Sequence, residues 1–324
     1  MISNKEKIIW TLFGGFLILL FLLSSTDIII KEKKTEIYPV SVIIGDTSDD
    51  FYLNFRKGID KAALEYSVDV SFITLYEQGD AIQQMELVKR EIDDGTKAIV
   101  LVPANPVECA KILDSMVVNS PLIIAGNMFP NEHVKAGISM DYEEAGKKLG
   151  EAIIAENSPD TPIWLFCQSL NYGENTDVYN GIIDVLIKAG FTAELYERNT
   201  EDTFRQIIEG TVYPGDKEAI IAALDVVSLN ETADILAGSQ VYRKHISQLY
   251  GVGSTTKILN QMDRGIIRGV VTSNQFDSGY LCIEKAVEVI NSDTGREQIV
   301  LDSYYIEKED IRKSSFEKIL YPID

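Results

Sequence analysis

YPVSVIIGDTSDDFYLNFRKGIDKAALE, residues 38–65, combines an apolar run, a polar loop and an amphipathic segment. The run from Val40 to Ile44 is rich in β-branched residues and ends at Gly45, a pattern typical of a strand that is buried on both faces. The loop of residues 46–52 leads directly into a helix-period segment, Leu53 to Tyr66. We therefore predict an α/β fold, with this loop at the carboxyl end of a parallel strand, where open α/β sheets bind ligands.

The chemistry of this loop favours a hydroxyl-bearing ligand. It contains no Gly-x-Gly-x-x-Gly and no Gly-Lys-Ser/Thr motif, so we expect no phosphate-binding cradle. Asp49 and Asp50 instead offer carboxylates beside the aromatic rings of Phe51 and Tyr52. Carboxylates form strong hydrogen bonds with hydroxyl groups, and flat rings suit the apolar faces of a sugar. In an alternative interpretation, the two acids cap the following helix and the rings pack between loop and helix.

Composition excludes several classes of protein. A chain of 324 residues is long enough for two lobes with their own cores. Its formal charge of −20 argues against a nucleic-acid partner, because phosphate binding needs clustered Lys and Arg. Cys109, Cys167 and Cys282 have no Cys-x-x-Cys spacing, so we predict buried thiols rather than disulfides or a zinc site. We expect His133 and His245 at the surface, and neither a metal nor a cofactor.

The N-terminus predicts a membrane segment. Residues 8–26 approach the roughly 20 apolar residues that span a bilayer, after a tail of residues 1–7 and before a charged tether of residues 27–37. A cleaved secretory signal is the alternative, because Lys5 and Lys7 precede the apolar run. No cysteine directly follows this run, which argues against a lipoprotein anchor. The basic residues on its two sides are too evenly balanced to set the orientation.

The rest of the chain alternates between two periodicities. Strand-like and helix-like segments of this length indicate βαβ units and parallel sheets, and two successive series predict two doubly wound lobes. The expected strands are residues 70–75, 98–102, 121–125, 162–167, 219–224, 245–252, 269–272 and 299–306. The expected helices are residues 81–93, 107–119, 142–156, 177–190, 231–238 and 279–291.

The order of these segments, together with several short motifs, resembles the type I periplasmic binding proteins, in particular the sugar-binding branch that includes ribose-binding protein. The resemblance covers residues 38 to about 310, and it rests on the ordered set rather than on one motif. The motifs are Ser48-Asp49-Asp50-Phe51-Tyr52-x-x-Phe55-x-x-Gly58, Asp80-x-x-x-Gln84, residues 95–103, Pro121-Leu122-Ile123-Ile124, Asp141-x-x-x-Ala145-Gly146, Asn180-Gly181, residues 222–225 and residues 274–280. The related repressors carry a helix-turn-helix headpiece, and here an apolar segment stands in its place.

The resemblance implies two lobes joined by three chain crossovers that act as a hinge. Residues 38–139 and 274–298 would form the N-terminal lobe, and residues 140–273 and 299–324 the C-terminal lobe. Asp49 would accept sugar hydroxyl hydrogens while Phe51 and Tyr52 stack on the ring. The complete set of implied ligand-binding residues is Asp49, Phe51, Tyr52, Asn127, Asp141, Asp225, Asn274 and Gln275. For Asp225, capping of a helix remains open as an alternative.

Several positions depart from the family pattern. Asn127-Met128 stands where Asp-Arg is frequent, and Gly253 replaces the aspartate of a Gly-x-Asp turn. The arginine that usually precedes the second-lobe helix is absent from residues 176–178, and Leu224 replaces an asparagine. The fold inference survives these changes, but the identity of the ligand does not transfer with it.

We expect an extracytoplasmic solute-binding protein, held at the cell membrane by its N-terminal helix. It would capture a small sugar, polyol or sugar-like ligand for uptake by an ABC permease. Alternatively, it would be a membrane-anchored receptor that presents its bound state to a sensor histidine kinase. Paired carboxylates also fit glycoside hydrolysis, but the sequence has neither a Gly-x-Ser-x-Gly elbow nor a cysteine–histidine pairing. We therefore expect no enzyme and no catalytic residues.

Overall fold

The computed structural model describes residues 3–25, 37–198, 203–212, 218–292 and 295–322, which belong to two compact units, Met1–Ile37 and Tyr38–Asp324. The first unit contains the helix α1, Asn4–Ser25. Its part Asn4–Leu23 is long and apolar enough to cross a membrane. The expected tether, residues 27–37, lies outside the described residues except for its last residue.

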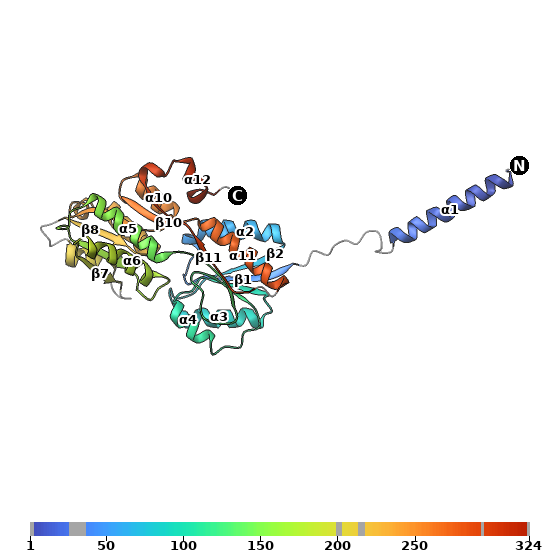
Figure 1. The fold of residues 1–324 in the computed structure, drawn as a ribbon, viewed down its shortest axis with the longest axis horizontal. Helices are drawn as coiled ribbons and strands as arrows, with labels where there is room; N and C mark the ends of the chain where they lie inside the picture. The colour runs from blue at the N-terminus through green and yellow to red at the C-terminus, as the bar shows by residue number, and fades with distance from the viewer. Residues whose placement is uncertain (1–2, 26–36, 199–202, 213–217, 293–294, 323–324) are drawn as a thin grey trace. The chain divides into compact units, whose positions relative to one another are not determined.

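The second unit contains two six-stranded sheets (Figure 1). The sheet of the N-terminal lobe has the order β11-β5-β4-β3-β1-β2 and is parallel throughout. The sheet of the C-terminal lobe has the order β12-β10-β9-β8-β6-β7 and is parallel except for β12. The strands are β1 Tyr38–Ile43, β2 Val68–Ile73, β3 Ala98–Leu101, β4 Leu122–Ala125, β5 Val134–Met140, β6 Ile163–Cys167, β7 Ala193–Glu197, β8 Ala219–Ala223, β9 Ile246–Val252, β10 Gly269–Ser273, β11 Glu297–Leu301 and β12 Ser303–Glu307. The expected α/β class with two parallel-sheet lobes is confirmed.

Helices pack on both sheets (Figure 1). Those of the N-terminal lobe are α2 Leu53–Tyr66, α3 Ala81–Asp93, α4 Pro106–Leu113 and α11 Gln275–Asn291. Those of the C-terminal lobe are α5 Tyr142–Glu156, α6 Asn175–Lys188, α7 Phe204–Ile207, α8 Val226–Gly238, α9 Gln240–Arg243, α10 Thr256–Asp263 and α12 Ser314–Leu320.

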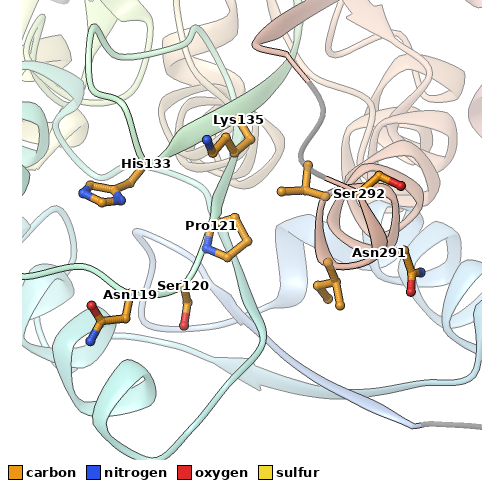
Figure 2. Close-up of a pocket in the computed structure, with 9 residues that line it drawn as sticks. Asn119, Ser120, Pro121, His133, Lys135, Asn291 and Ser292 are labelled. Carbon is orange, nitrogen blue, oxygen red and sulfur yellow. The ribbon is translucent and has the colours of Figure 1, made fainter.

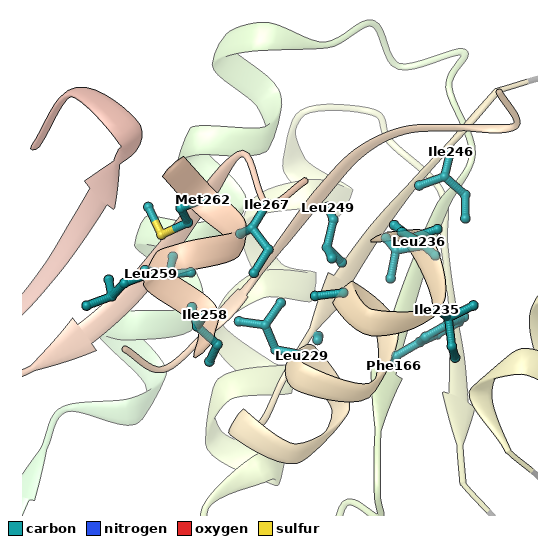
Figure 3. Packing of buried hydrophobic residues seen from close by; sticks show 14 of the residues in the cluster. Phe166, Leu229, Ile235, Leu236, Ile246, Leu249, Ile258, Leu259, Met262 and Ile267 are labelled. Atoms are coloured by element: carbon teal, nitrogen blue, oxygen red, sulfur yellow. The ribbon is translucent and has the colours of Figure 1, made fainter. Parts of the chain in front are cut away.

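Each sheet has an apolar cluster on either face, as expected for parallel strands. The strand run that opens the body is fully buried, with Val42, Ile43 and Ile44 at 0 % exposure. Figure 3 shows one cluster of the C-terminal lobe, in which Leu229 of α8 and Met262 of α10 belong to the same packed group as the strand residues. The lobes therefore have separate cores, and the space between them is available for a site.

Three links of one residue each join the lobes. Asp141 separates β5 from α5, Asn274 separates β10 from α11, and Asp302 separates β11 from β12. The expected single strand at residues 299–306 is wrong, because its first part pairs with β5 in one sheet and its second part with β10 in the other. The third crossover consequently lies at Asp302 and not before residue 299. A continuous strand-like pattern cannot indicate a change of sheet.

Each lobe contains a helix pair that packs through glycines. In the N-terminal lobe α2 meets α11 at Gly58 and Gly279, and a Cβ added to Gly58 would lie 2.0 Å from the carbonyl oxygen of Phe276. In the C-terminal lobe α5 meets α6 at Gly146 and Gly181, and a Cβ on Gly181 would lie 2.0 Å from the carbonyl oxygen of Glu143. Both lobes thus use the same close approach of helix backbones.

Candidate functional site

A cavity of about 590 Å³ lies between the lobes, at the carboxyl ends of their strands. The loop after β1 contributes the wall from the N-terminal lobe, and the loops after β6, β8, β9 and β10 contribute the opposite wall. The lining residues are Asp46, residues 50–54, Met140, Tyr142, Tyr172, Val226, Val227, Asn230, residues 252–257, Thr272, Ser273 and Gln275. Because the carboxyl ends of parallel strands meet at one edge of a sheet, side chains from distant parts of the chain converge here.

Four aromatic residues line this cavity: Phe51, Tyr52, Tyr142 and Tyr172. A short 3-10 helix, Asp50–Tyr52, carries the first two and leads into α2. The Tyr52 ring packs edge-to-face on Phe55, with the ring centroids 6.2 Å apart. Burial raises the pKa of the Tyr142 hydroxyl, so this group remains a neutral hydrogen-bond donor and acceptor. The aromatic content suits a ligand with apolar faces.

Asp46 is the buried acid of the site. Its side chain is only 3 % exposed, directly after the strand-ending Gly45. The hydroxyl of Tyr172 and the amide of Gln78 each donate to Oδ1 at 2.6 Å, and the Tyr52 hydroxyl donates to Oδ2 at 2.5 Å. Burial, together with the Asp46 charge, raises the pKa of Tyr52 and of Tyr172, which keeps both phenols protonated as donors.

The contact from Tyr172 belongs to a larger set of hydrogen bonds between the lobes. Tyr172 reaches Asp46 from the C-terminal lobe, and the next residue, Gly173, donates its backbone N–H to the carbonyl oxygen of Ala104 at 3.0 Å. The side chain of Gln78 also donates to Gln168 across the cleft at 3.3 Å. The two lobes are therefore in direct contact around the cavity.

A second contact between the lobes lies at Asn127. Its backbone N–H donates to Glu174 Oε1 at 3.0 Å, and its side-chain amide donates to Glu174 Oε2 at 3.3 Å and to Asp177 Oδ2 at 3.2 Å. Burial raises the pKa of Glu174, and Asp177 adds to this effect. Burial likewise raises the pKa of Asp177. One amide thus binds two neighbouring carboxylates of the other lobe.

Residues 40–295 match a family model described as a periplasmic binding protein domain. The chain belongs to this family. The expected resemblance is confirmed, and with it the two-lobed architecture. A search of curated proteins gives no match to this chain.

Solved periplasmic binding proteins share this fold. The chain is similar to a carbohydrate transporter solute-binding protein from Agrobacterium radiobacter in complex with D-arabinose, at 16% identity and a TM-score of 0.76 over 87% of this chain and 98% of that one. It is also similar to GanP, a glucose-galactose binding protein from Geobacillus stearothermophilus, at 15% identity and a TM-score of 0.72 over 86% of this chain and 100% of that one. A third similar structure is the complex of the TorS sensor domain with TorT without ligand, at 15% identity and a TM-score of 0.72, covering 89% of this chain and 98% of that one.

The structure brings three of the eight residues expected in the ligand site to the cavity wall: Phe51, Tyr52 and Gln275. Asp49 points elsewhere and forms an ion pair with Arg56, while its neighbour Asp50 lines the cavity. Asn127 belongs to the contact between the lobes. Tyr172, which the sequence offers as a compensating contact, also lines the cavity. Asp46 was missed, although its position as the first polar residue after a buried strand was an available signal.

The remaining three expected residues each cap the start of a helix. Two of them, Asp141 and Asn274, are also links between the lobes. Asp141 accepts a hydrogen bond from the backbone N–H of Glu144 at the start of α5. Asn274 does the same for Asp277 at the start of α11. Asp225 is buried and accepts from the backbone N–H of Ser228 at the start of α8, and from that of Gln168. Helix capping, the alternative considered for Asp225, is observed for all three residues. A polar residue between a strand and a helix is suited both to capping and to ligand binding, so the sequence does not separate the two roles.

A separate groove of about 380 Å³ lies at the amino ends of β4 and β5, away from the cleft. Figure 2 shows His133 and Lys135 on one side of it, with Asn119, Ser120 and Pro121 nearby and the end of α11 opposite. Its lining includes Asn291, which accepts a hydrogen bond from the hydroxyl of Tyr38 at 2.8 Å. The groove shares no residue with the cavity between the lobes.

The described residues contain no group of three or more His, Cys, Asp or Glu side chains arranged to hold a metal ion. The three cysteines are buried and free. Burial raises the pKa of the Cys109 thiol to about 11, which leaves it protonated at neutral pH. The cavity wall presents aromatic rings, carboxylates, hydroxyl groups, amides and one lysine.

Proposed function

We propose that this periplasmic binding protein is an extracytoplasmic solute-binding protein that captures a small sugar or sugar-like ligand between its lobes. The observation that carries the proposal is the cavity of about 590 Å³ with walls from both lobes. This volume lies within the range of small-molecule sites. Closure of two lobes on a ligand excludes water and strengthens the hydrogen bonds inside.

The proposed ligand contacts divide by chemistry. Phe51 and Tyr52 would pack on the apolar face of the ligand, and Gln275 would exchange hydrogen bonds with its hydroxyl groups. Asp46 would accept from a hydroxyl group while Tyr172 holds the carboxylate in place. We infer no conversion of the ligand: the family consists of binding proteins, and the protein would release the ligand unchanged.

The protein would be anchored by α1, with the binding body outside the cytoplasm. The length and apolar composition of Asn4–Leu23 support this proposal. Its partner would be an ABC permease, a proposal supported by the similarity to an ABC transporter solute-binding protein from Agrobacterium vitis.

A sensor histidine kinase is the second candidate partner. The specific observation in its favour is the similarity to the complex of TorT with the TorS sensor domain. A helical anchor would also hold the body next to a membrane-embedded kinase. Cross-linking in membranes, followed by identification of the attached protein, separates the two proposals: a permease supports uptake and a kinase supports signalling.

Thermal unfolding of the full-length protein in detergent, in the presence of sugars and polyols, tests the proposed function. A ligand at about 100 times its dissociation constant should stabilise the protein by about 2.7 kcal/mol. Phe51→Ala should abolish most of this shift, whereas Leu64→Ala, on an exposed position of α2, should leave it unchanged. Absence of any shift across the panel would contradict the proposal, and so would recovery of a cleaved ligand.

A further inference from the structure

Two acids of the cavity wall have no cationic partner among the described residues. Asp46 and Asp50 both line the cavity. The hydrogen-bond partners of Asp46 are two phenols and an amide, all neutral. Within the described part of the chain, neither acid forms an ion pair with Lys, Arg or His. Lys257 is a cation of the lining, but its ammonium group pairs with Asp234.

Burial of an ionised carboxylate without a counter-charge is costly, and hydrogen bonds from neutral donors offset only part of the cost. Three donors nevertheless converge on the Asp46 carboxylate. Oδ1 accepts from two of these donors and Oδ2 from one. A carboxylate offers about four acceptor positions, so Oδ2 has capacity for a further donor.

Aromatic residues line the same cavity as this carboxylate. Tyr52 and Tyr172, which hold Asp46, line the cavity together with Phe51 and Tyr142. Aromatic faces attract cations through the ring quadrupole, and the attraction increases in a site without water. A carboxylate next to several rings is therefore better matched to a cation than to a neutral hydroxyl group.

We infer that the ligand carries a protonated amine, which binds between the Asp46 carboxylate and the surrounding aromatic rings. The chemical class is a small hydroxylated amine, of which an amino sugar is one example. This inference rests on the proposed function, because it concerns the same cavity. The ammonium group would supply the missing positive charge and donate to Oδ2, while the hydroxyl groups of the ligand meet the polar wall of the C-terminal lobe.

Calorimetric titration of the full-length protein in detergent with matched pairs of compounds tests the inference. The pairs are D-glucosamine with D-glucose, D-galactosamine with D-galactose, and choline with its neutral isostere 3,3-dimethylbutan-1-ol. In at least one pair the cation should bind about tenfold more tightly than its neutral partner. Its affinity should also fall with added salt more than that of the neutral compound.

Two charge-removing variants locate the effect. Asp46→Asn and Asp50→Asn should each reduce the preference for the cation about tenfold, and Asp60→Asn, on an exposed position of α2, should leave it unchanged. The preference is the affinity for the cation divided by the affinity for its neutral partner, and it is measured separately for each variant. If Asp46→Asn fails to fold, the preference of the Asp50→Asn variant for the cation tests the inference, because Asp50 is exposed.

The outcomes separate the two proposals. If neutral sugars bind as tightly as their amine partners, the inference is wrong and the proposed function stands. If cations are preferred and every charge-removing variant that folds retains the full preference, the placement of the amine is wrong. If no compound of either kind binds, the proposed function fails together with the inference.

Discussion

Tyr172 is the residue whose hydroxyl most directly joins the lobes at the cavity, through its bond of 2.6 Å to Asp46. Hydrogen bonds to charged groups contribute about 1.5–3 kcal/mol. Tyr172→Phe should therefore open the cleft and increase the radius of gyration measured by small-angle X-ray scattering. Tyr196→Phe is the matched control, because that hydroxyl bonds to Glu194 on the same strand. Identical scattering for Tyr172→Phe and the unsubstituted protein would contradict the role of this bond.

At the scale of single residues, the sequence predicted the loop that lines the cavity but selected Asp49, whereas Asp46 and Asp50 are the acids of that loop in the lining. Asp46, Asp49 and Asp50 all lie within the same polar segment, and their side-chain directions depend on how the chain turns after Gly45. Asp49 forms an ion pair with Arg56, seven residues later, while Asp46 turns inward and is buried. The place of Asp46 directly after the buried strand is the one local signal for its burial, and its partner Tyr172 is distant in sequence.

Among the helices, the paired glycines reverse the usual effect of a substitution. Alanine normally stabilises a helix by about 1 kcal/mol relative to glycine. At Gly58 or Gly181, however, the added Cβ would meet the carbonyl oxygen of the neighbouring helix at 2.0 Å. Gly58→Ala and Gly181→Ala should each destabilise the body by about 1–3 kcal/mol in chemical denaturation.

The control for this prediction is Gly238→Ala at the end of α8, where no atom lies within 4 Å of an added Cβ. That substitution should be neutral or slightly stabilising. Equal stability of all three variants would show that the helix pairs can separate without cost.

Periodicity determined how well individual elements could be predicted. The helices at Leu53–Tyr66, Ala81–Asp93 and Tyr142–Glu156 have the expected bounds, because an amphipathic pattern identifies one buried face. Strand β5, Val134–Met140, was not expected, since Lys135 and Gly137 interrupt its apolar pattern. It is recognisable only in its sheet, where β4 and β11 pair with its two edges.

At the scale of the whole molecule, the bonds from Asn127 to Glu174 and Asp177 couple closure of the lobes to pH. The contact buries Glu174 and raises its pKa above that of an exposed carboxyl group. Burial and the nearby Glu143 and Asp141 raise the pKa of Asp177 as well. The closed form then binds protons more tightly than an open form with exposed side chains. A fall in pH through the raised pKa should favour closure, and this preference is lost as the pH rises above it.

Small-angle X-ray scattering of the unliganded protein across mildly acidic to neutral pH measures this effect, as a smaller radius of gyration at lower pH. Glu174→Gln imitates the protonated state and should remain compact across the range. Glu151→Gln, on an exposed position of α5, should retain the pH dependence of the original protein. A radius of gyration that increases on acidification would contradict the assignment.

The link at Asp302 limits how the body can deform. Leu301 and Ser303 belong to different sheets, yet two peptide units allow their Cα atoms to be at most about 7.6 Å apart. Together with the equally short links at Asp141 and Asn274, this keeps the sheets from drawing apart or sliding at that end. The movement that these links still allow is a rotation of one lobe about a hinge at the links. In such a rotation, residues at the far rim of the cleft move much further than residues beside the links. Extra residues inserted after Asp302 would lengthen this link. The two lobes would then no longer be restricted to rotation about one common axis.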